Sequence, residues 1–371
     1  SILKPAGWMH YRYPFIYGQP DTRQFPLATW RSAANWLHGG VRDPAWVIDH
    51  IDQDVPMLIE QIRTRVLPKR GIVAAPDEIL ITLGSQNALY LLTRLLLSST
   101  TRIGVENPCF REAINTFLLA DAEVVPHPVD EEGIVLNERP CDYYYVTPGH
   151  QVPTGVTMSS ARRRQLLEHA ARHDAVIIED DYDSESNFTL NPLPALKASD
   201  RSGRVVYVSS LSKALSPGLR LGFMVADPDL IDEARALRRL VYRHPPTNIQ
   251  YQMAHFLAQG HYETHLRRYH YDSAQRWERL HAALQRYLPS CRALAGSEHA
   301  NAFWLQTPAQ INTQQLTWRA AHAGVLIEPG ARHFLSAAPP DNYFRMGFHA
   351  INPDAIAQGV EVLRGQLEQM G

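Results

Sequence analysis

From about residue 77 the chain alternates short β-branched runs with stretches of helical periodicity, and this alternation restricts the possible folds more than any other feature. Strand–helix alternation is typical of βαβ units, whose strands form a mostly parallel sheet covered by helices. We therefore expect an α/β fold. The expected strands are Ile79–Thr82, Arg102–Glu106, Glu123–His127, Asp142–Thr147, Ala175–Asp181, Val205–Ser209 and Leu219–Ala226, with helices at Ser85–Leu97, Arg111–Leu119 and Ser159–Arg172.

The pattern changes near residues 288–290, where shorter α+β units replace the regular alternation. Before this point, Ile249–Tyr287 has the periodicity of long amphipathic helices, which suits a connector. A final helix is expected over Pro353–Gln369. We predict an N-terminal arm over residues 1–49, a large domain over residues 50–275 and a smaller α+β domain over residues 276–371.

Composition excludes several classes of function. The 371 residues carry a formal net charge of -2, so no concentrated basic surface is expected to bind nucleic acid through this chain itself. The apolar stretch around Leu89–Leu97 is too short to span a membrane. The three cysteines are far apart and form neither a disulfide framework nor a metal-ligand spacing. With no recognisable signal peptide, a cytoplasmic location is expected.

The strongest chemical motif is residues 209–222, which read SSLSKALSPGLRLG and follow an apolar strand. Burial of Lys213 at a strand end would disfavour its ammonium form, and a neutral amine is the form that attacks an aldehyde. Ser210, Ser212 and Arg220 supply donors suited to a phosphate dianion. The alternative is an ordinary surface lysine after a strand, which would not explain the rest of the motif.

A second motif lies at the end of another apolar strand, where Asp180 and Tyr182 are two residues apart and should share one face. A carboxylate beside a pyridine nitrogen keeps that nitrogen protonated, and a phenol can hydrogen-bond a ring oxygen. An acidic solvated turn and a metal site are the alternatives that this motif leaves open on its own.

Three further features are weaker when taken singly. Gly84, Ser85 and Gln86 join a strand to a helix start, a turn that can bind an anion but lacks the glycine fingerprint of dinucleotide sites. Phe110 follows a strand and could stack on a ring, or be plain core. Arg345 lies in an apolar strand and needs an anionic partner, either a ligand carboxylate or a structural ion pair.

Together and in this order, these motifs resemble the fold type I PLP-dependent aminotransferases, where PLP is pyridoxal 5′-phosphate. More narrowly, they resemble the aminotransferase-like domain of MocR-type transcriptional regulators, a GntR subfamily. The narrower resemblance rests on residues 147–156 (TPGHQVPTGV), 178–185 (IEDDYDSE), 192–197 (PLPALK) and 211–222.

The resemblance implies a role for each motif. Lys213 would form the imine with PLP, Asp180 would face the pyridine nitrogen, Tyr182 would face the 3-oxygen and Phe110 would stack on the ring. The resemblance also implies a homodimer, and the residues that hold the phosphate would be Ser85, Gln86, Ser210 and Arg220. For the ligand, Arg345 would take a carboxylate, and Tyr17 and Gly18 of the N-terminal arm would lie nearby.

The sequence also departs from the families it resembles. Val152 stands where ordinary aminotransferases have an asparagine, and residues 50–58 lack the stretch through which MocR-type domains usually reach the partner's phosphate. The winged helix-turn-helix of a MocR-type regulator is not among these residues, and the start at Ser1 rather than at a methionine suggests an excised domain.

Two functions fit these motifs. The first is the sensing and dimerisation domain of a MocR-type regulator, in which an amino-compound effector displaces Lys213 to form an external aldimine. The second is a free-standing aminotransferase, in which Lys213 is the general base between an amino acid and a 2-oxo acid. A NAD-dependent oxidoreductase shares the α/β alternation but would need the missing glycine fingerprint.

Overall fold

The structure is a computed structural model that describes residues 7–40, 45–49, 52–137, 139–189, 192–294 and 300–370. Within these ranges, an eight-stranded sheet runs in the order β2-β9-β8-β7-β6-β3-β4-β5. Strands β8, β7, β6, β3 and β4 are mutually parallel, whereas β9 is antiparallel to both of its neighbours. The expected α/β fold with a mostly parallel sheet is therefore confirmed. The strands are β2 (Ile79–Thr82), β3 (Arg102–Asn107), β4 (Glu123–Asp130), β5 (Gly133–Ile134), β6 (Tyr143–Val146), β7 (Val176–Asp181), β8 (Val205–Ser210) and β9 (Gly222–Val225).

Strand β9 is shorter than the strand expected over Leu219–Ala226. Pro217–Leu219 forms a 3-10 turn that begins with proline, and Arg220 adopts a left-handed conformation with φ of 53°. A residue in that region of φ/ψ space cannot continue an extended strand. The turn therefore delays the strand until Gly222.

Helices cover both faces of this sheet because neighbouring strand residues point to opposite sides. On one face, Leu92 of α3 and Phe117 of α4 pack with Tyr145 of β6. On the other face, Leu166 of α5 packs with Tyr144, the preceding residue of the same strand. These helices and their neighbours are α2 (Pro56–Gln61), α3 (Ser85–Leu96), α4 (Arg111–Leu118), α5 (Ser160–Arg172), α6 (Leu196–Ser199), α7 (Pro228–Val241) and α8 (Thr247–Ala258).

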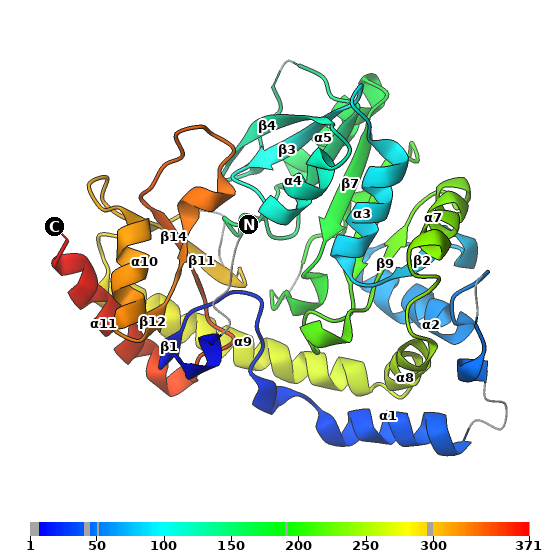
Figure 1. Cartoon of the computed structure of the whole chain (residues 1–371), viewed down its shortest axis with the longest axis horizontal. Coiled ribbons are helices and arrows are strands. Elements are labelled where there is room, and N and C mark those ends of the chain that lie inside the picture. The colour runs from blue at the N-terminus through cyan, green and yellow to red at the C-terminus, as the bar shows by residue number, and fades with distance from the viewer. Residues whose placement is uncertain are drawn as a thin grey trace.

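A smaller unit contains an antiparallel sheet in the order β10-β11-β14-β13, and residues of α10, α11 and the second half of α9 (His261–Tyr287) share its core. The N-terminal arm runs alongside this unit, because β1 (Tyr13–Pro14) pairs with β12 (Val325–Leu326) (Figure 1). The arm continues into α1 (Leu27–Gly40). The remaining elements are β10 (Arg292–Ala293), β11 (Ala302–Gln306), β13 (Glu328–Pro329), β14 (Tyr343–Gly347), α10 (Thr313–His322) and α11 (Ile356–Glu368).

One long helix, α9 (His261–Tyr287), joins the two units and runs across the lower part of the molecule, above α1, in Figure 1. In its first half, His265 Nε2 lies 2.9 Å from the carbonyl oxygen of Ala214 in the large unit. In its second half, Leu280 and Leu284 belong to the core of the small unit. The domain boundary predicted at residue 275 falls inside this helix and stays a prediction.

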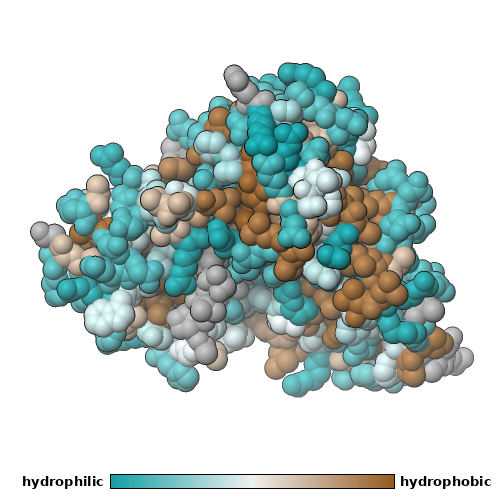
Figure 2. Space-filling model, turned by 45° about the horizontal axis from the view of Figure 1, so that its top comes forward, coloured by the Kyte–Doolittle hydropathy of each residue, from teal (hydrophilic) through white to brown (hydrophobic). Residues whose placement is uncertain are grey.

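Polar and apolar side chains are unevenly distributed on the surface. Figure 2 shows apolar side chains gathered over the part of the molecule that holds the large sheet. No helix in the described ranges combines the length and the apolar character needed to cross a membrane.

Candidate functional site

A cleft of about 460 Å³ lies where the large sheet, the N-terminal arm and the small unit meet. Every site residue predicted from the sequence lines this cleft except Gly84. Gly84 lies next to the guanidinium of Arg220, which does line the cleft. Residues that the sequence analysis did not propose for the site also line it. They are Gln19, Glu112, Val152, Pro217, Glu328 and His333.

Lys213 follows β8 and reaches into the cleft between two aromatic rings. Its Nζ lies 4.5 Å from the ring centre of Tyr17 and 4.6 Å from that of Tyr182. The adjacent Ser212 hydroxyl donates to the carbonyl oxygen of Leu221 at 2.9 Å and accepts from the Leu221 N–H at 2.7 Å. Ser212 therefore stabilises the turn that carries Lys213, and its hydroxyl is already engaged with the backbone.

Asp180 is a buried carboxylate near the end of β7. Its Oδ2 accepts a hydrogen bond from the Tyr145 hydroxyl at 2.8 Å, whereas its Oδ1 is buried without a hydrogen-bond partner among the described residues. Burial raises the pKa of Asp180 to about 7. A buried, unpartnered carboxylate oxygen in a cleft is suited to accept an N–H from a protonated ring. Asp180 therefore fits the pyridine nitrogen of PLP.

The neighbouring Asp181 has a different role, because successive residues of a strand point to opposite sides of the sheet. Its Oδ2 accepts hydrogen bonds from Arg70 Nε at 2.7 Å and from the Tyr207 hydroxyl at 2.8 Å. These buried partners satisfy the charge of Asp181 within the core. Because side chains alternate between the two sides of β7, Asp181 points into the core and Asp180 faces the cleft.

The other end of the cleft has the chemistry of an anion site. Helix α3 begins at Ser85, and its first N–H groups receive no side-chain cap from Gly84. The Arg220 guanidinium lies against this turn and donates to the carbonyl oxygen of Leu83 at 3.0 Å. A Cβ at residue 84 would lie only 2.8 Å from Arg220 Nη2, and Gly84 has a φ of 82°, a conformation that favours glycine. A helix N-terminus beside a guanidinium and the Ser210 hydroxyl suits the phosphate of PLP.

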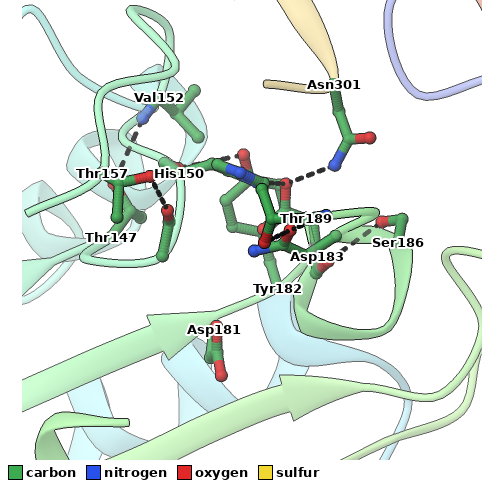
Figure 3. A network of polar contacts seen from close by, with 12 residues as sticks. Thr147, His150, Val152, Thr157, Asp181, Tyr182, Asp183, Ser186, Thr189 and Asn301 are labelled. Atoms are coloured by element: carbon green, nitrogen blue, oxygen red, sulfur yellow. Dashed lines mark hydrogen bonds and ion pairs between the residues drawn. The ribbon is translucent and has the colours of Figure 1, made fainter. Parts of the chain in front are cut away.

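Tyr182 belongs to a buried polar network that crosses between the two units (Figure 3). Its hydroxyl donates to the carbonyl oxygen of His150 at 3.2 Å. The His150 side chain contacts Asp183 Oδ2 at 2.9 Å, and Asn301 of the small unit donates to the same oxygen at 2.8 Å. Burial opposes ionisation of Asp183, but the charge and hydrogen bonds of these partners outweigh it and lower its pKa. The sequence analysis did not identify this network, although His150 and Asp183 lie within the motifs that carry the resemblance.

Arg345 lies in the middle of β14 and is only 5% exposed. Its Cζ lies 3.5 Å from the ring centre of Tyr17, and its Nη1 lies 3.9 Å from Glu328 Oε2. The Arg345 Nε is buried without a hydrogen-bond partner in the part of the chain that the structure describes. A buried guanidinium with spare donors is suited to bind an acid group of a ligand.

A second set of contacts fixes Arg345 and Glu328 against the large sheet. The Cys109 N–H donates to the carbonyl oxygen of His333 at 2.9 Å, and His333 Nδ1 lies 2.9 Å from the carbonyl oxygen of Cys109. His333 Nε2 in turn contacts Glu328 Oε1 at 3.2 Å. These contacts place the first turn of α4, with Phe110 and Glu112, at the same side of the cleft as Arg345. No periodicity in the sequence signals contacts between such distant segments.

Comparison with known proteins gives consistent matches over nearly the whole chain. Residues 52–363 match the family model described as aminotransferase class I and II. The HTH-type transcriptional regulator TauR of Rhodobacter capsulatus is 39% identical over 94% of this chain and 72% of that protein. The probable rhizopine catabolism regulatory protein MocR of Rhizobium meliloti is 33% identical over 95% of this chain and 72% of that protein.

The fold is also similar to solved enzyme structures. The crystal structure of LysN, an alpha-aminoadipate aminotransferase from Thermus thermophilus complexed with N-(5′-phosphopyridoxyl)-L-leucine, superposes with a TM-score of 0.85. It is 27% identical, and the match covers 96% of this chain and 92% of LysN.

Proposed function

Because this chain belongs to the aminotransferase class I and II family and matches MocR-type regulators along most of its length, we propose that it holds PLP on Lys213 and senses amino compounds. In this function it is the effector-binding and dimerisation domain of a MocR-type transcription regulator. The observation that carries the proposal is that Lys213 and Asp180, whose Oδ1 is buried without a hydrogen-bond partner among the described residues, line the same cleft.

The residues of the cleft divide the work of holding the cofactor. Asp180 Oδ1 would accept the ring N–H, Tyr182 would face the 3-oxygen and Phe110 would stack on the ring. The phosphate would lie between the start of α3 and Arg220. When bound, PLP supplies an aldehyde and an electron-withdrawing ring.

The ligand would contact both units of the chain at once. Its acid group would pair with Arg345 of the small unit, while its amino group would meet the end of β8 in the large unit. A ligand that binds one arrangement of the two units more tightly shifts the population towards that arrangement. This differential binding is the physical basis of sensing.

A free-standing aminotransferase is the second candidate, and the similarity to LysN favours it. In that function Lys213 would act as a general base that removes the proton from the α-carbon of the substrate and holds it on its amine. The same residues would hold the cofactor in both functions. The two functions differ in whether the amino compound only binds or is converted to product.

A screen of amino compounds against the PLP-loaded protein tests the proposal. We expect particular amino acids to shift the visible absorption of the cofactor, with less than one product formed per protein when a 2-oxo acid is added. Arg345→Gln should weaken these shifts for ligands with an acid group. Rapid multiple turnover would instead establish the aminotransferase, and no spectral response to any amino compound would contradict both functions.

The proposal also includes a homodimer, for which the exposed apolar surface is the supporting observation. Val47 and Leu240 are 65% and 82% exposed. Asp49 pairs with Arg243 at 2.8 Å, which brings the two apolar segments together. Exposed apolar patches of this kind mark association surfaces. We expect Leu240→Glu to raise the dimer dissociation constant by about tenfold or more in sedimentation experiments, whereas Trp318→Glu on α10 should not.

A further inference from the structure

Glu112 is a carboxylate that lines the cleft. Neither the cofactor nor the acid group of the ligand would offer it a positively charged partner. It lies in the first turn of α4, and its Oε2 is buried without a hydrogen-bond partner among the described residues. The dipole of α4 stabilises a carboxylate at this position only weakly. An unsatisfied buried acceptor, above all a charged one, destabilises the protein by more than this dipole stabilises it. The helix alone therefore does not account for Glu112.

The other charged residues of the cleft are already assigned. Asp180 would face the ring nitrogen, Arg220 the phosphate and Lys213 the aldehyde. Glu328 contacts His333 and Arg345, and Arg345 would hold the acid group of the ligand. Once these pairs are formed, Glu112 still lacks a positively charged partner, which a second cationic group on the ligand would provide.

The contacts between the two units bring the start of α4, which carries Glu112, close to the segment that carries Glu328. Cys109, two residues before α4, and His333 exchange backbone and side-chain contacts of 2.9 Å, and His333 Nε2 in turn contacts Glu328 Oε1 of β13 at 3.2 Å. On that strand Glu328 pairs in register with Arg345 of β14. An amino acid bound to Arg345 by its carboxylate can therefore extend its side chain towards α4.

We propose that Glu112 determines ligand specificity by pairing with a second, cationic group, so that the effector class is the diamino monocarboxylic acids. This inference rests on the proposed function, because it assumes that an amino compound binds at Lys213 and Arg345. A dicarboxylic amino acid would bring two like charges together at Glu112, and a ligand with an apolar side chain would leave Glu112 unpaired.

Matched ligands of equal chain length test the inference on the PLP-loaded protein. The sets are 2-aminobutyrate, 2,4-diaminobutyrate and aspartate; norvaline, ornithine and glutamate; and norleucine, lysine and 2-aminoadipate. Dissociation constants are measured by the absorption shift and by calorimetry. We expect the diamino acid to bind about tenfold or more tightly than its neutral analogue in at least one set, the size of one charge-assisted hydrogen bond.

Variants assign that preference to Glu112. Glu112→Gln keeps the shape but removes the charge, so it should reduce the preference to near unity, and Glu112→Arg should shift it towards the dicarboxylic acid. Glu263→Gln is the matched control. Glu263 is also a first-turn glutamate with a buried, unpartnered Oε2, but it lies on α9 outside the cleft. This control should leave every ligand affinity unchanged.

The possible outcomes separate this inference from the proposed function. Spectral shifts with neutral amino acids that are as large and as tight as those with diamino acids would overturn the inference alone. So would a Glu112→Gln protein that weakens all ligands equally and dissociates more readily, because Glu112 would then pair across the dimer. A protein that carries PLP on Lys213 but responds to no amino compound would overturn both.

Discussion

The side of the cleft that faces the cofactor and the side that faces the ligand are built from different parts of the chain. The cofactor side, formed by Gly84, Asp180, Lys213 and Arg220, lies on the ends of neighbouring strands of one sheet. The ligand side contains residues of the N-terminal arm, of α4 and of the small unit. These residues are Tyr17, Glu112, Glu328, His333 and Arg345.

The two sides are also held by different kinds of contact. On the cofactor side, Ser212 is bound to Leu221, nine residues away in the same turn. On the ligand side, Cys109 and Leu335 are held by partners more than 220 residues away. The cofactor side is therefore set once the large sheet forms, whereas the ligand side depends on how the two units meet. Cofactor affinity and ligand affinity should consequently respond to different substitutions.

The largest effect is expected from Lys213→Ala, which removes the amine on the cofactor side. The protein should lose its own visible absorption after loading with PLP, and borohydride treatment should leave no covalent label. Mass spectrometry of the digested protein measures the label. A label of normal intensity on another lysine would show that the cofactor side has been assigned to the wrong residue.

Asp180→Asn should lower PLP affinity by about 10- to 100-fold, because it replaces a charge-assisted hydrogen bond with a neutral one. The effect should also depend on pH. Burial raises the pKa of Asp180 from 3.8 to about 7, so the folded chain binds more protons than the unfolded chain between these values. The contribution of Asp180 to the free energy of unfolding therefore falls as pH rises through this window.

The protonated ring nitrogen of bound PLP would pair with the ionised Asp180. This pairing would offset the fall in the free energy of unfolding that Asp180 causes as pH rises. We expect the increase in Tm on adding PLP to grow between pH 5 and 8 more steeply in the wild type than in Asp180→Asn. Thermal unfolding with and without PLP measures both slopes. Glu179, whose pKa is also raised to about 7, acts on both proteins and cancels in the comparison. The charge of Asp180 contributes to the raised pKa of Glu106, so any change at Glu106 is part of the effect of the substitution. Equal slopes would remove Asp180 from the ring nitrogen.

Gly84→Ala should have a smaller effect, confined to the cofactor side. The new Cβ would meet Arg220 Nη2 at 2.8 Å in a turn with φ of 82°, which displaces the guanidinium from the phosphate site. Gly203→Ala is the matched control, since Gly203 has φ of 70° but open space around it. Both variants should lose about 1 kcal/mol of stability from the backbone. Only Gly84→Ala should weaken PLP binding, as measured by fluorescence titration.

Asn107→Ala should give the smallest effect and should act on the ligand side alone. Asn107 Oδ1 accepts a hydrogen bond of 3.0 Å from the Leu335 N–H, which joins the two units beside His333. Its loss should weaken ligand binding by about 3- to 10-fold without changing PLP affinity. Asn352→Ala removes a similar hydrogen bond to Asp354 within the small unit and serves as the control. Equal losses of PLP affinity and ligand affinity would contradict the separation of the two sides.

The same separation explains what could be predicted from the sequence. Strand periodicity and the lysine motif are local, so the large sheet and the residues Asp180, Lys213 and Arg220 could be located from the order of the amino acids alone. Arg345 could be identified because a lone arginine in an apolar strand needs an anion. Glu112, Glu328 and His333 could not, because their positions depend on contacts between distant segments. The turn before β9 was also missed, since the left-handed conformation of Arg220 has no sequence signature.

The continuity of α9 has a mechanical consequence for any signal that starts at the lysine. Its first half contacts Ala214, one residue after Lys213, while its second half is embedded in the small unit. A helix of this length is about 40 Å long and rigid along its axis, so a tilt of about one degree at one end displaces the other by about 0.7 Å. A small displacement of the segment around Lys213 would therefore be transmitted through α9 as a larger displacement of the small unit.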